Sequence, residues 1–369
     1  MKKPRPVKFV DLKKQYAVIG RQAGIAAGKV MLSGSYILGE QVRGFEKEFA
    51  GYCGTRFGAG VASGTEALCL ALKACGVGPG DEVITVANAG VPPVVAIEMA
   101  GGIPVFADVD PGTCLMDASK LGKRISRRTK AVLPVHLHGR CADMRGIMGI
   151  ARRKGLRVVE DACQAHGALY KGKKAGAIGD AGCFSFYPTK NLGCFGDGGM
   201  VVTSDSSIDR KVRMLRDYGQ SARYVHEFRG INSRLDELQA AILRVKLKRL
   251  DAWNRKRAEL AGIYAAMLEN GYVRKPEAAD KGSHVYHLYV VKCPHRDMLR
   301  GHLRMNGIET LVHYPVPVYM QKAYSDLRKG NRCPASEKLC DTVLSLPLYP
   351  EIDTGDIERV CRAINRFRP

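Results

Sequence analysis

The sequence lacks the long apolar stretches that membrane segments require. No run of about 18 or more uncharged apolar residues occurs in the chain of 369 residues, so we expect no transmembrane helix. The basic N-terminus, MKKPRPVKFVDLKKQY, has no apolar stretch behind it, which argues against a signal peptide. We therefore expect a cytoplasmic protein with no membrane partner.

Paired cysteines are also missing. None of the twelve cysteines belongs to a CxxC pair or to a Cys/His cluster at zinc spacing. They stand singly in apolar segments, as Cys69, Cys183 and Cys293 do. Buried free thiols in a reducing cytosol explain this pattern better than a disulfide framework does.

Acidic residues are scarce: 36 Asp and Glu stand against 58 Lys and Arg, a net charge of +22. Such a balance raises the question of a nucleic-acid partner. The basic residues are spread along the chain, however, and no nucleic-acid module or basic tail occurs. A solvated basic surface is the favoured interpretation, and a field that attracts phosphorylated substrates is the alternative. We expect no nucleic-acid partner.

What the chain does contain is a series of short β-type runs that alternate with helical patterns between about residues 58 and 205. This alternation predicts an α/β fold with a mostly parallel sheet and helices on both faces. The predicted strands are VITVAN (83–88), IPVFADVD (103–110), AVLPVHL (131–137), LRVVEDA (156–162), CFSFY (183–187) and MVVTS (200–204). An amphipathic segment at 142–155 predicts one of the helices.

The pattern changes after residue 233, where apolar spacing predicts one long amphipathic helix with Ser233 and Asp236 in its first turn. The length of the chain favours two domains. We place the boundary in or just after this helix, with a large domain over 1–250 and a smaller α+β domain over 251–369. In the latter, 284–293 predicts a strand and 296–308 a helix.

Functional sites in such sheets lie at the carboxyl ends of the strands. One polar segment there, Ser63-Gly64-Thr65, directly precedes a helical pattern. A helix N-terminus with free N–H groups can bind an anion such as a phosphate. An ordinary N-cap explains the same residues.

A second polar group ends the strand LRVVEDA in Glu160 and Asp161, with Gln164 and His166 beyond. A buried carboxylate is costly unless it meets a cation. Asp161 could cap the next turn, or it could face a protonated heterocycle. We expect no metal, because no second carboxylate or histidine lies at ligand spacing, and we expect a structural role for His166.

The third segment is FSFYPTKNLGCFGDGG (184–199), which carries Ser185 and Lys190 out of an apolar strand into a glycine-rich turn. Lys190 could simply face water. Together with a phosphate site and a buried carboxylate 29 residues earlier, however, it matches what pyridoxal phosphate (PLP) requires. The lysine forms a Schiff base with the aldehyde, and the carboxylate keeps the pyridine nitrogen protonated.

From FVDLKKQY (9–16) to LSLPLYPE (344–351), the sequence resembles the DegT/StrS sugar aminotransferases, a family of fold-type I PLP enzymes. The combination of VEDACQAHGA with FSFYPTKNLGCFGDGG is the most specific part of the resemblance. It implies that Lys190 is the Schiff-base lysine and the proton carrier, that Asp161 pairs with the pyridinium nitrogen, and that Gln164 bonds the phenolic oxygen side of the ring.

The resemblance also implies a phosphate site made of Gly64, Thr65 and Ser185. Asn232, in GINSRLDE, would reach the phosphate of the neighbouring subunit's cofactor. We therefore expect a homodimer with shared active sites. HYPVPVY (313–319) contributes His313 and Tyr314 as candidates for the acceptor pocket, although a structural turn explains that segment equally well.

One position departs from the family pattern. Family members commonly have an aromatic residue in a segment resembling ANTFIAT, and this residue stacks on the cofactor ring. This chain has ANAGVPPVV, with Gly90 at that place. The ring contact is then weaker, supplied by another residue, or replaced by an aliphatic contact from Val91.

We expect a PLP-dependent aminotransferase that moves an amino group from an amino acid, glutamate in the simplest case, to a keto-sugar, most simply a nucleotide-linked one. The product would be an amino sugar for a surface glycan or a secondary metabolite. The alternatives are a sugar dehydratase or isomerase that uses the same cofactor, and a non-catalytic PLP-binding regulator. Lys190 argues against dehydration, because the dehydrating branch of the family has histidine there.

Overall fold

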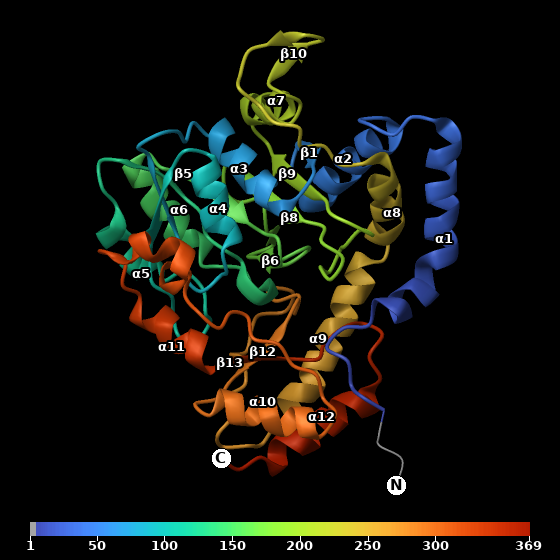
Figure 1. Cartoon of the computed structure of the whole chain (residues 1–369), viewed down its shortest axis with the longest axis vertical. Helices are drawn as coiled ribbons and strands as arrows, with labels where there is room; N and C mark the ends of the chain where they lie inside the picture. The colour runs from blue at the N-terminus through green and yellow to red at the C-terminus, as the bar shows by residue number, and fades with distance from the viewer. Residues whose placement is uncertain (1–4) are drawn as a thin grey trace.

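The computed structural model describes residues 5–369 and is built around a central sheet of seven strands (Figure 1). The strand order is β1-β9-β8-β5-β4-β2-β3. All neighbours pair in parallel except β9, which is antiparallel to both β1 and β8. The predicted α/β class with a mostly parallel sheet is confirmed. The strands are β1 (Phe57–Val61), β2 (Glu82–Thr85), β3 (Ile103–Phe106), β4 (Thr129–Val132), β5 (Arg157–Asp161), β8 (Ala181–Ser185) and β9 (Gly199–Thr203).

Each of the six predicted β-type runs overlaps a strand, but β1 was not predicted. Its sequence, FGAGV, has two glycines, which weaken a strand on local criteria. Packing explains them. A Cβ at Gly58 would lie 2.9 Å from the carbonyl oxygen of Glu46, and one at Gly60 would lie 3.0 Å from Cβ of Leu235. The glycines therefore let two neighbouring segments approach the strand that leads to Ser63.

Helices cover both faces of the sheet, because successive side chains of a strand point to opposite faces. In β8, Cys183 belongs to the core under one helical layer and Phe184 to the core under the other. The first layer consists of α3 (Gly64–Ala74), α4 (Pro92–Met99) and α7 (Ser206–Leu215), because α4 and α7 both pack on α3. The second consists of α2 (Glu40–Cys53) and α8 (Glu237–Leu247), and α1 (Leu12–Ser33) runs along α8 (Figure 1). Helix α6 (Met144–Lys154) connects β4 to β5 and packs against β5.

The prediction of a single long helix after residue 233 is wrong. This segment forms two helices, because α8 ends at Leu247 and α9 (Leu250–Met267) begins after a short break. Asp236 is the N-cap of α8. Ser233 lies before the helix, where its hydroxyl donates to Glu66 at 2.6 Å and accepts from the N–H of Ala62 at 3.2 Å. It therefore ties the chain to the start of α3.

A second core lies around α9, α10 (Arg296–Met305), α12 (Thr354–Arg366) and the antiparallel pair β12 (Tyr289–Lys292) and β13 (Val343–Leu346). The predicted strand at 284–293 is thus shorter than expected, and the predicted helix ends at Asn306-Gly307, as its sequence suggested. This separate core supports a domain boundary after residue 250. The two-domain division itself stays a prediction. Residues 1–4 of the predicted large domain lie outside the described residues.

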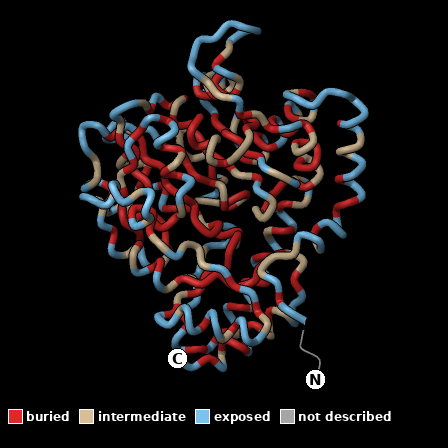
Figure 2. The backbone as a smooth tube through the Cα atoms, in the orientation of Figure 1, coloured by how far each residue is buried: buried red, intermediate tan, exposed pale blue. Residues whose placement is uncertain are grey.

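The remaining elements are short. They are α5 (Ala118–Leu121), α11 (Pro334–Thr342), β6 (Leu169–Tyr170), β7 (Lys173–Lys174), β10 (Gln220–Ala222), β11 (Val225–His226) and the 3-10 turns Gly122–Arg124, Leu137–Gly139, Val318–Met320 and Lys322–Arg328. The β10–β11 hairpin projects from the body and is largely exposed (Figures 1 and 2). No helix in the described part of the chain combines the length and apolar character that a bilayer span needs. Eleven of the twelve cysteines are buried free thiols, and Cys163 is half-buried.

A buried ionic cluster fixes the position of β1. Glu46 of α2 is 4% exposed and accepts hydrogen bonds from the N–H of Gly60 at 2.9 Å and from Arg213 at 2.9 Å, and it pairs with the buried Arg216. Burial alone would raise the pKa of Glu46, but Arg216 and Arg213 outweigh it and hold the pKa below its usual range. The cluster joins α2, β1 and α7.

We expect Arg216→Met to lower the free energy of unfolding by about 3 kcal/mol, because it leaves a buried carboxylate with only part of its compensation. Since the folded-state pKa of Glu46 is depressed, this stabilisation is complete above the unfolded pKa of about 4.3 and is lost as the pH falls through the folded pKa. Urea unfolding at pH 7 and pH 3 measures both effects. Arg210→Met, an exposed change on the same helix, should change stability by less than about 0.5 kcal/mol. Equal losses in the two variants would contradict the prediction.

Candidate active site

The carboxyl ends of β1, β5 and β8 meet at one edge of the sheet. Both β1 and β8 are antiparallel to β9, and β5 is parallel to β8, so the three strands run in one direction. The segments that follow them surround a cavity of about 260 Å³. The structure brings together around it most of the site residues predicted from the sequence, namely Gly64, Thr65, Asp161, Gln164, Ser185, Lys190 and Tyr314.

The N-terminus of α3 forms one wall of this cavity. Ser63 is its N-cap, and its hydroxyl accepts from the N–H of Glu66 at 3.2 Å. The first N–H groups of a helix have no acceptor within the helix, so those of Gly64 and Thr65 are available to an anion. A Cβ at Gly64 would lie 2.6 Å from Cβ of Ser185. Only glycine therefore lets the helix end and the Ser185 hydroxyl share one small space.

Asp161 and its neighbour Glu160 point to opposite faces of β5. Glu160 is fully buried and accepts from His136 at 2.8 Å and from three backbone N–H groups, which fixes the loop after β7. Asp161 is 6% exposed, and its carboxylate accepts from the N–H of Cys163 at 3.1 Å. Within residues 5–369 it forms no ion pair, and burial raises its pKa. Asp161 is thus a buried acid that a cation would stabilise.

Lys190 follows β8 in a tight loop, where its N–H donates to the carbonyl oxygen of Tyr187 at 2.9 Å. Burial lowers the pKa of its amine, and the nearby Cys163 and Asp161 only partly oppose that effect. The neutral, nucleophilic form is therefore easier to reach than in a free lysine. The loop is held from behind by the fully buried Lys246 of α8, which donates to the carbonyl oxygen of Gly193.

The side chain of Gln164 has a fixed orientation. Its Oε1 accepts from the N–H of His138 at 2.7 Å, which leaves Nε2 as the group on the cavity side. Nε2 donates to the hydroxyl of Tyr314 at 3.4 Å. The amide therefore presents a donor to the cavity, as an anionic oxygen would need.

Three residues singled out from the sequence do not line the cavity. Asn232 is exposed, and it pairs with Asp217 near the β10–β11 hairpin. His313 stacks on Phe9, and its Nδ1 shares a hydrogen bond of 2.8 Å with the hydroxyl of Ser345. His166 is fully buried among phenylalanine rings, and burial lowers its pKa to about 3.

Sequence reasoning placed Ser63 in the possible anion-binding segment without a role of its own, and it missed the cavity residues Cys163, Tyr187 and Asp197. Asp197 stands inside the quoted segment FGDGG, so proximity in sequence could have found it. Cys163 and Tyr187 carry no signal of their own. In the described part of the chain, no group of three or more His, Cys, Asp or Glu is placed to hold a metal ion.

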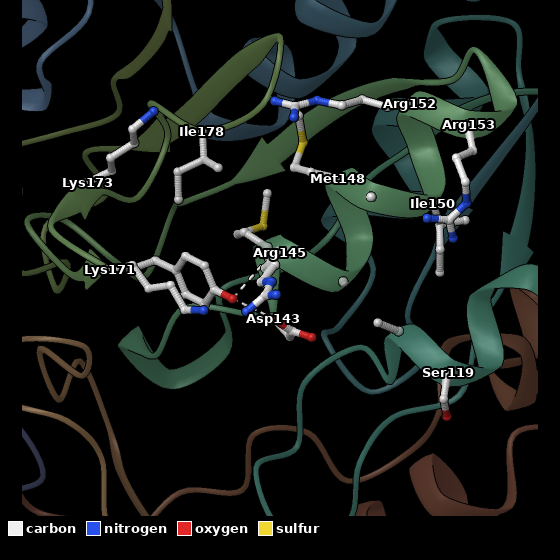
Figure 3. A pocket seen from close by; sticks show the side chains of 15 residues that line it. Ser119, Asp143, Arg145, Met148, Ile150, Arg152, Arg153, Lys171, Lys173 and Ile178 are labelled. Atoms are coloured by element: carbon white, nitrogen blue, oxygen red, sulfur yellow. Dashed lines mark hydrogen bonds between the residues drawn. The ribbon is translucent and has the colours of Figure 1, made fainter.

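A larger surface hollow of about 820 Å³ lies against α6 and contains none of the predicted site residues (Figure 3). The charged ends of Arg152, Arg153 and Lys173 are spread around its rim. The carboxylate of Asp143 accepts a hydrogen bond from the hydroxyl of Tyr170 at 2.6 Å. Size therefore does not locate the chemistry, because the smaller cavity at the strand ends holds the convergent polar groups.

Comparisons with known proteins agree with this geometry. A relative from Streptomyces venezuelae, dTDP-3-amino-3,4,6-trideoxy-alpha-D-glucose transaminase, is 44% identical over 363 residues, which cover 98% of this chain and 96% of the relative. UDP-N-acetyl-3-dehydro-alpha-D-glucosamine 3-aminotransferase from Acidithiobacillus ferrooxidans is 43% identical over 360 residues, covering 98% and 97%. A solved structure, S. venezuelae DesV in complex with a ketimine intermediate, matches with a TM-score of 0.95 at 44% identity and covers 98% of each chain.

These matches confirm the predicted fold class and the assignment as a PLP-dependent aminotransferase. The model of the DegT/DnrJ/EryC1/StrS aminotransferase family matches residues 20–365, which is nearly the whole chain. The chain belongs to the DegT/DnrJ/EryC1/StrS aminotransferase family.

Proposed function

We propose that this aminotransferase carries an amino group from glutamate to the keto group of a nucleotide-linked sugar. The observation that carries the proposal is the cavity shared by Lys190, an amine that burial makes easier to deprotonate, and Asp161, a buried acid that forms no ion pair within residues 5–369. A helix N-terminus with a hydroxyl opposite it completes the set. A phosphorylated pyridine aldehyde fits all three features.

The residues present divide among the parts of PLP. We assign the phosphate to Gly64, Thr65 and Ser185, because helix N–H groups and a hydroxyl suit a dianion. Asp161 supplies the carboxylate that keeps the ring nitrogen protonated, and Gln164 Nε2 supplies a donor for the phenolic oxygen. When bound, PLP withdraws electrons from the carbon that carries the amine.

Lys190 has two tasks in this proposal. Its Nζ would hold the aldehyde of PLP covalently, for which the amine must be neutral. The same Nζ would take the proton from the carbon that carries the amino group of glutamate and, in the second half-reaction, give a proton to the carbonyl carbon of the sugar. The burial that lowers its pKa serves both tasks.

We propose a homodimer in which Asn232 reaches the phosphate site of the neighbouring subunit. Asn232 is exposed and outside its own cavity, and the adjacent β10–β11 hairpin projects from the body (Figure 1). Both features suit a residue that acts across an interface. We place the enzyme in the cytoplasm, where glutamate, PLP and nucleotide sugars are found.

We further propose that the accepted keto group is at C3 of the sugar, since the names of the two relatives describe 3-amino or 3-dehydro sugars. The names differ in the nucleotide, dTDP in one and UDP in the other. The product is an amino sugar for a surface glycan or a secondary metabolite. The net charge of +22 is compatible with an anionic nucleotide substrate.

A two-stage experiment tests this function. Glutamate alone should convert the PLP-loaded protein to its amine-loaded form, with one 2-oxoglutarate released per site, and a dTDP- or UDP-3-keto-sugar should then restore the original absorbance. Initial rates should show ping-pong kinetics. Matched 4-keto-sugars serve as the control for the position. Loss of water from the sugar without transfer of nitrogen would support the dehydratase alternative and contradict the proposal.

A further inference from the structure

Gly90, at the place where the family pattern has an aromatic residue, lies in a loop with an unusual backbone. Gly90 has a φ of +81°, a left-handed conformation that residues with a Cβ rarely adopt. Pro92 and Pro93 follow at the first positions of α4 and line the cavity. An aromatic residue at position 90 would therefore be strained in this loop, so the missing ring is part of the local structure.

Another aromatic ring occupies the space beside Gly90. A Cβ built there would lie 3.1 Å from Cε1 and Cζ of Tyr314 and 3.3 Å from its Cε2, so the hydroxyl end of that ring rests against the glycine. Tyr314 lines the cavity together with Asp161 and Lys190. Its hydroxyl accepts from Gln164 Nε2 at 3.4 Å.

Val91 does not offer an equivalent contact. It is 36% exposed and is not one of the residues that line the cavity. Tyr314 is half-buried, and burial, followed by the proximity of Asp161, raises the pKa of its phenol. Of the two ways in which the chain could replace the missing aromatic residue, the structure therefore favours a ring from elsewhere in the sequence.

We propose that Tyr314 is the aromatic wall of the cofactor cavity and that Gly90 is the gap that admits it. This inference rests on the proposed function, because it assigns a residue to the same PLP site. In this assignment the ring comes from the segment after α10 rather than from the loop after β2. Tyr314 thereby contacts the cofactor, in addition to any contact with the acceptor sugar.

The segment that carries Tyr314 is anchored in a way that suits a wall. The adjacent His313 shares a hydrogen bond of 2.8 Å with Ser345 of β13, and its carbonyl oxygen lies 3.3 Å from Nε2 of His138. The N–H of His138 in turn holds Gln164. The position of the ring is thus set jointly by the second core and by the strand-end segments.

Binding of pyridoxamine phosphate, which needs no covalent link to Lys190, tests the proposal in the full-length apoprotein. We expect Tyr314→Leu to raise its dissociation constant about three- to tenfold, because an aromatic contact of ordinary strength is lost. Tyr314→Phe keeps the ring and should stay within about twofold of the wild type. Val91→Ala, the matched control in the same loop region, should bind like the wild type.

Two further measurements make the outcome decisive. Inhibition of pyridoxamine phosphate binding by inorganic phosphate should be unchanged in Tyr314→Leu, which shows that the fold and the phosphate site are intact. Gly90→Ala should also weaken binding, and its effect should be smaller in a Tyr314→Leu background, because the two residues are in contact. Wild-type affinity in Tyr314→Leu, or weakened binding in Val91→Ala instead, would overturn the inference. Failure of the wild-type protein to bind pyridoxamine phosphate at all would instead overturn the proposed function.

Discussion

Replacing Lys190 with alanine is expected to lower the rate of the half-reaction with glutamate by about 10³-fold or more, since one amine supplies both the covalent link and the proton transfer. Stopped-flow absorbance of the loaded protein measures this rate. Borohydride reduction should attach PLP to Lys190 in the wild type and leave that position unlabelled in the variant. The amine of Lys190 lies in the cavity, and burial lowers the pKa of this amine. We therefore expect its removal to slow the half-reaction strongly.

Lys173→Ala is the matched control, because this lysine is exposed on β7 and should not affect the rate. The same pair of variants separates an enzyme from a non-catalytic, PLP-binding regulator. In cells that depend on the protein, Lys190→Ala should fail to replace the wild type while Lys173→Ala succeeds. Full biological activity of Lys190→Ala would favour the regulator and contradict amino transfer.

The functional segments at the strand ends were predictable because short stretches of sequence are enough to identify them. An acid that ends an apolar strand, a glycine between hydroxyls before a helix, and a lysine in a glycine-rich turn each identify a position without any knowledge of the fold. The alternation of strands and helices then predicts that such positions share one edge of the sheet. The structure brings Asp161, Gly64 and Lys190 around one cavity, as this reasoning requires.

What the sequence could not provide depends on contacts between distant segments. The strand β1 contains two glycines, whose value lies in the close approach of Glu46 and Leu235. The buried Lys246 looks like an ordinary helix lysine until Gly193 is placed beside it. Such tertiary contacts override local propensity, and a single sequence does not reveal them.

Gly90 illustrates the same limit more sharply. The sequence shows that an aromatic residue is missing, but three explanations remained open. The choice among them needs the distance between Gly90 and Tyr314, two residues far apart in the chain, and the exposure of Val91. Geometry therefore turns an unexplained departure into a testable assignment.

Asp161→Ala is expected to reduce the rate of amino transfer roughly 10²- to 10³-fold while PLP still binds, because the phosphate site is separate from the carboxylate. Without Asp161 the pyridine nitrogen loses its proton near neutral pH, and the ring withdraws electrons less strongly. Asp161→Asn keeps the shape of the side chain but removes its charge, and should be similarly impaired. Steady-state kinetics with glutamate and a keto-sugar, together with the absorbance of bound PLP, measure rate and loading separately.

Chemical rescue distinguishes this role from a merely structural one. N-methyl pyridoxal phosphate carries a permanent positive charge at the ring nitrogen, and the alanine at position 161 leaves room for the methyl group. We expect the analogue to support a rate at least about tenfold higher than PLP does in Asp161→Ala, because it restores the charge that the carboxylate normally maintains. In the wild type, where Asp161 is 6% exposed and would face the ring nitrogen, the same analogue should give no advantage. If PLP and its N-methyl analogue gave equal rates in the alanine variant, the buried acid would be holding the site together rather than protonating the ring.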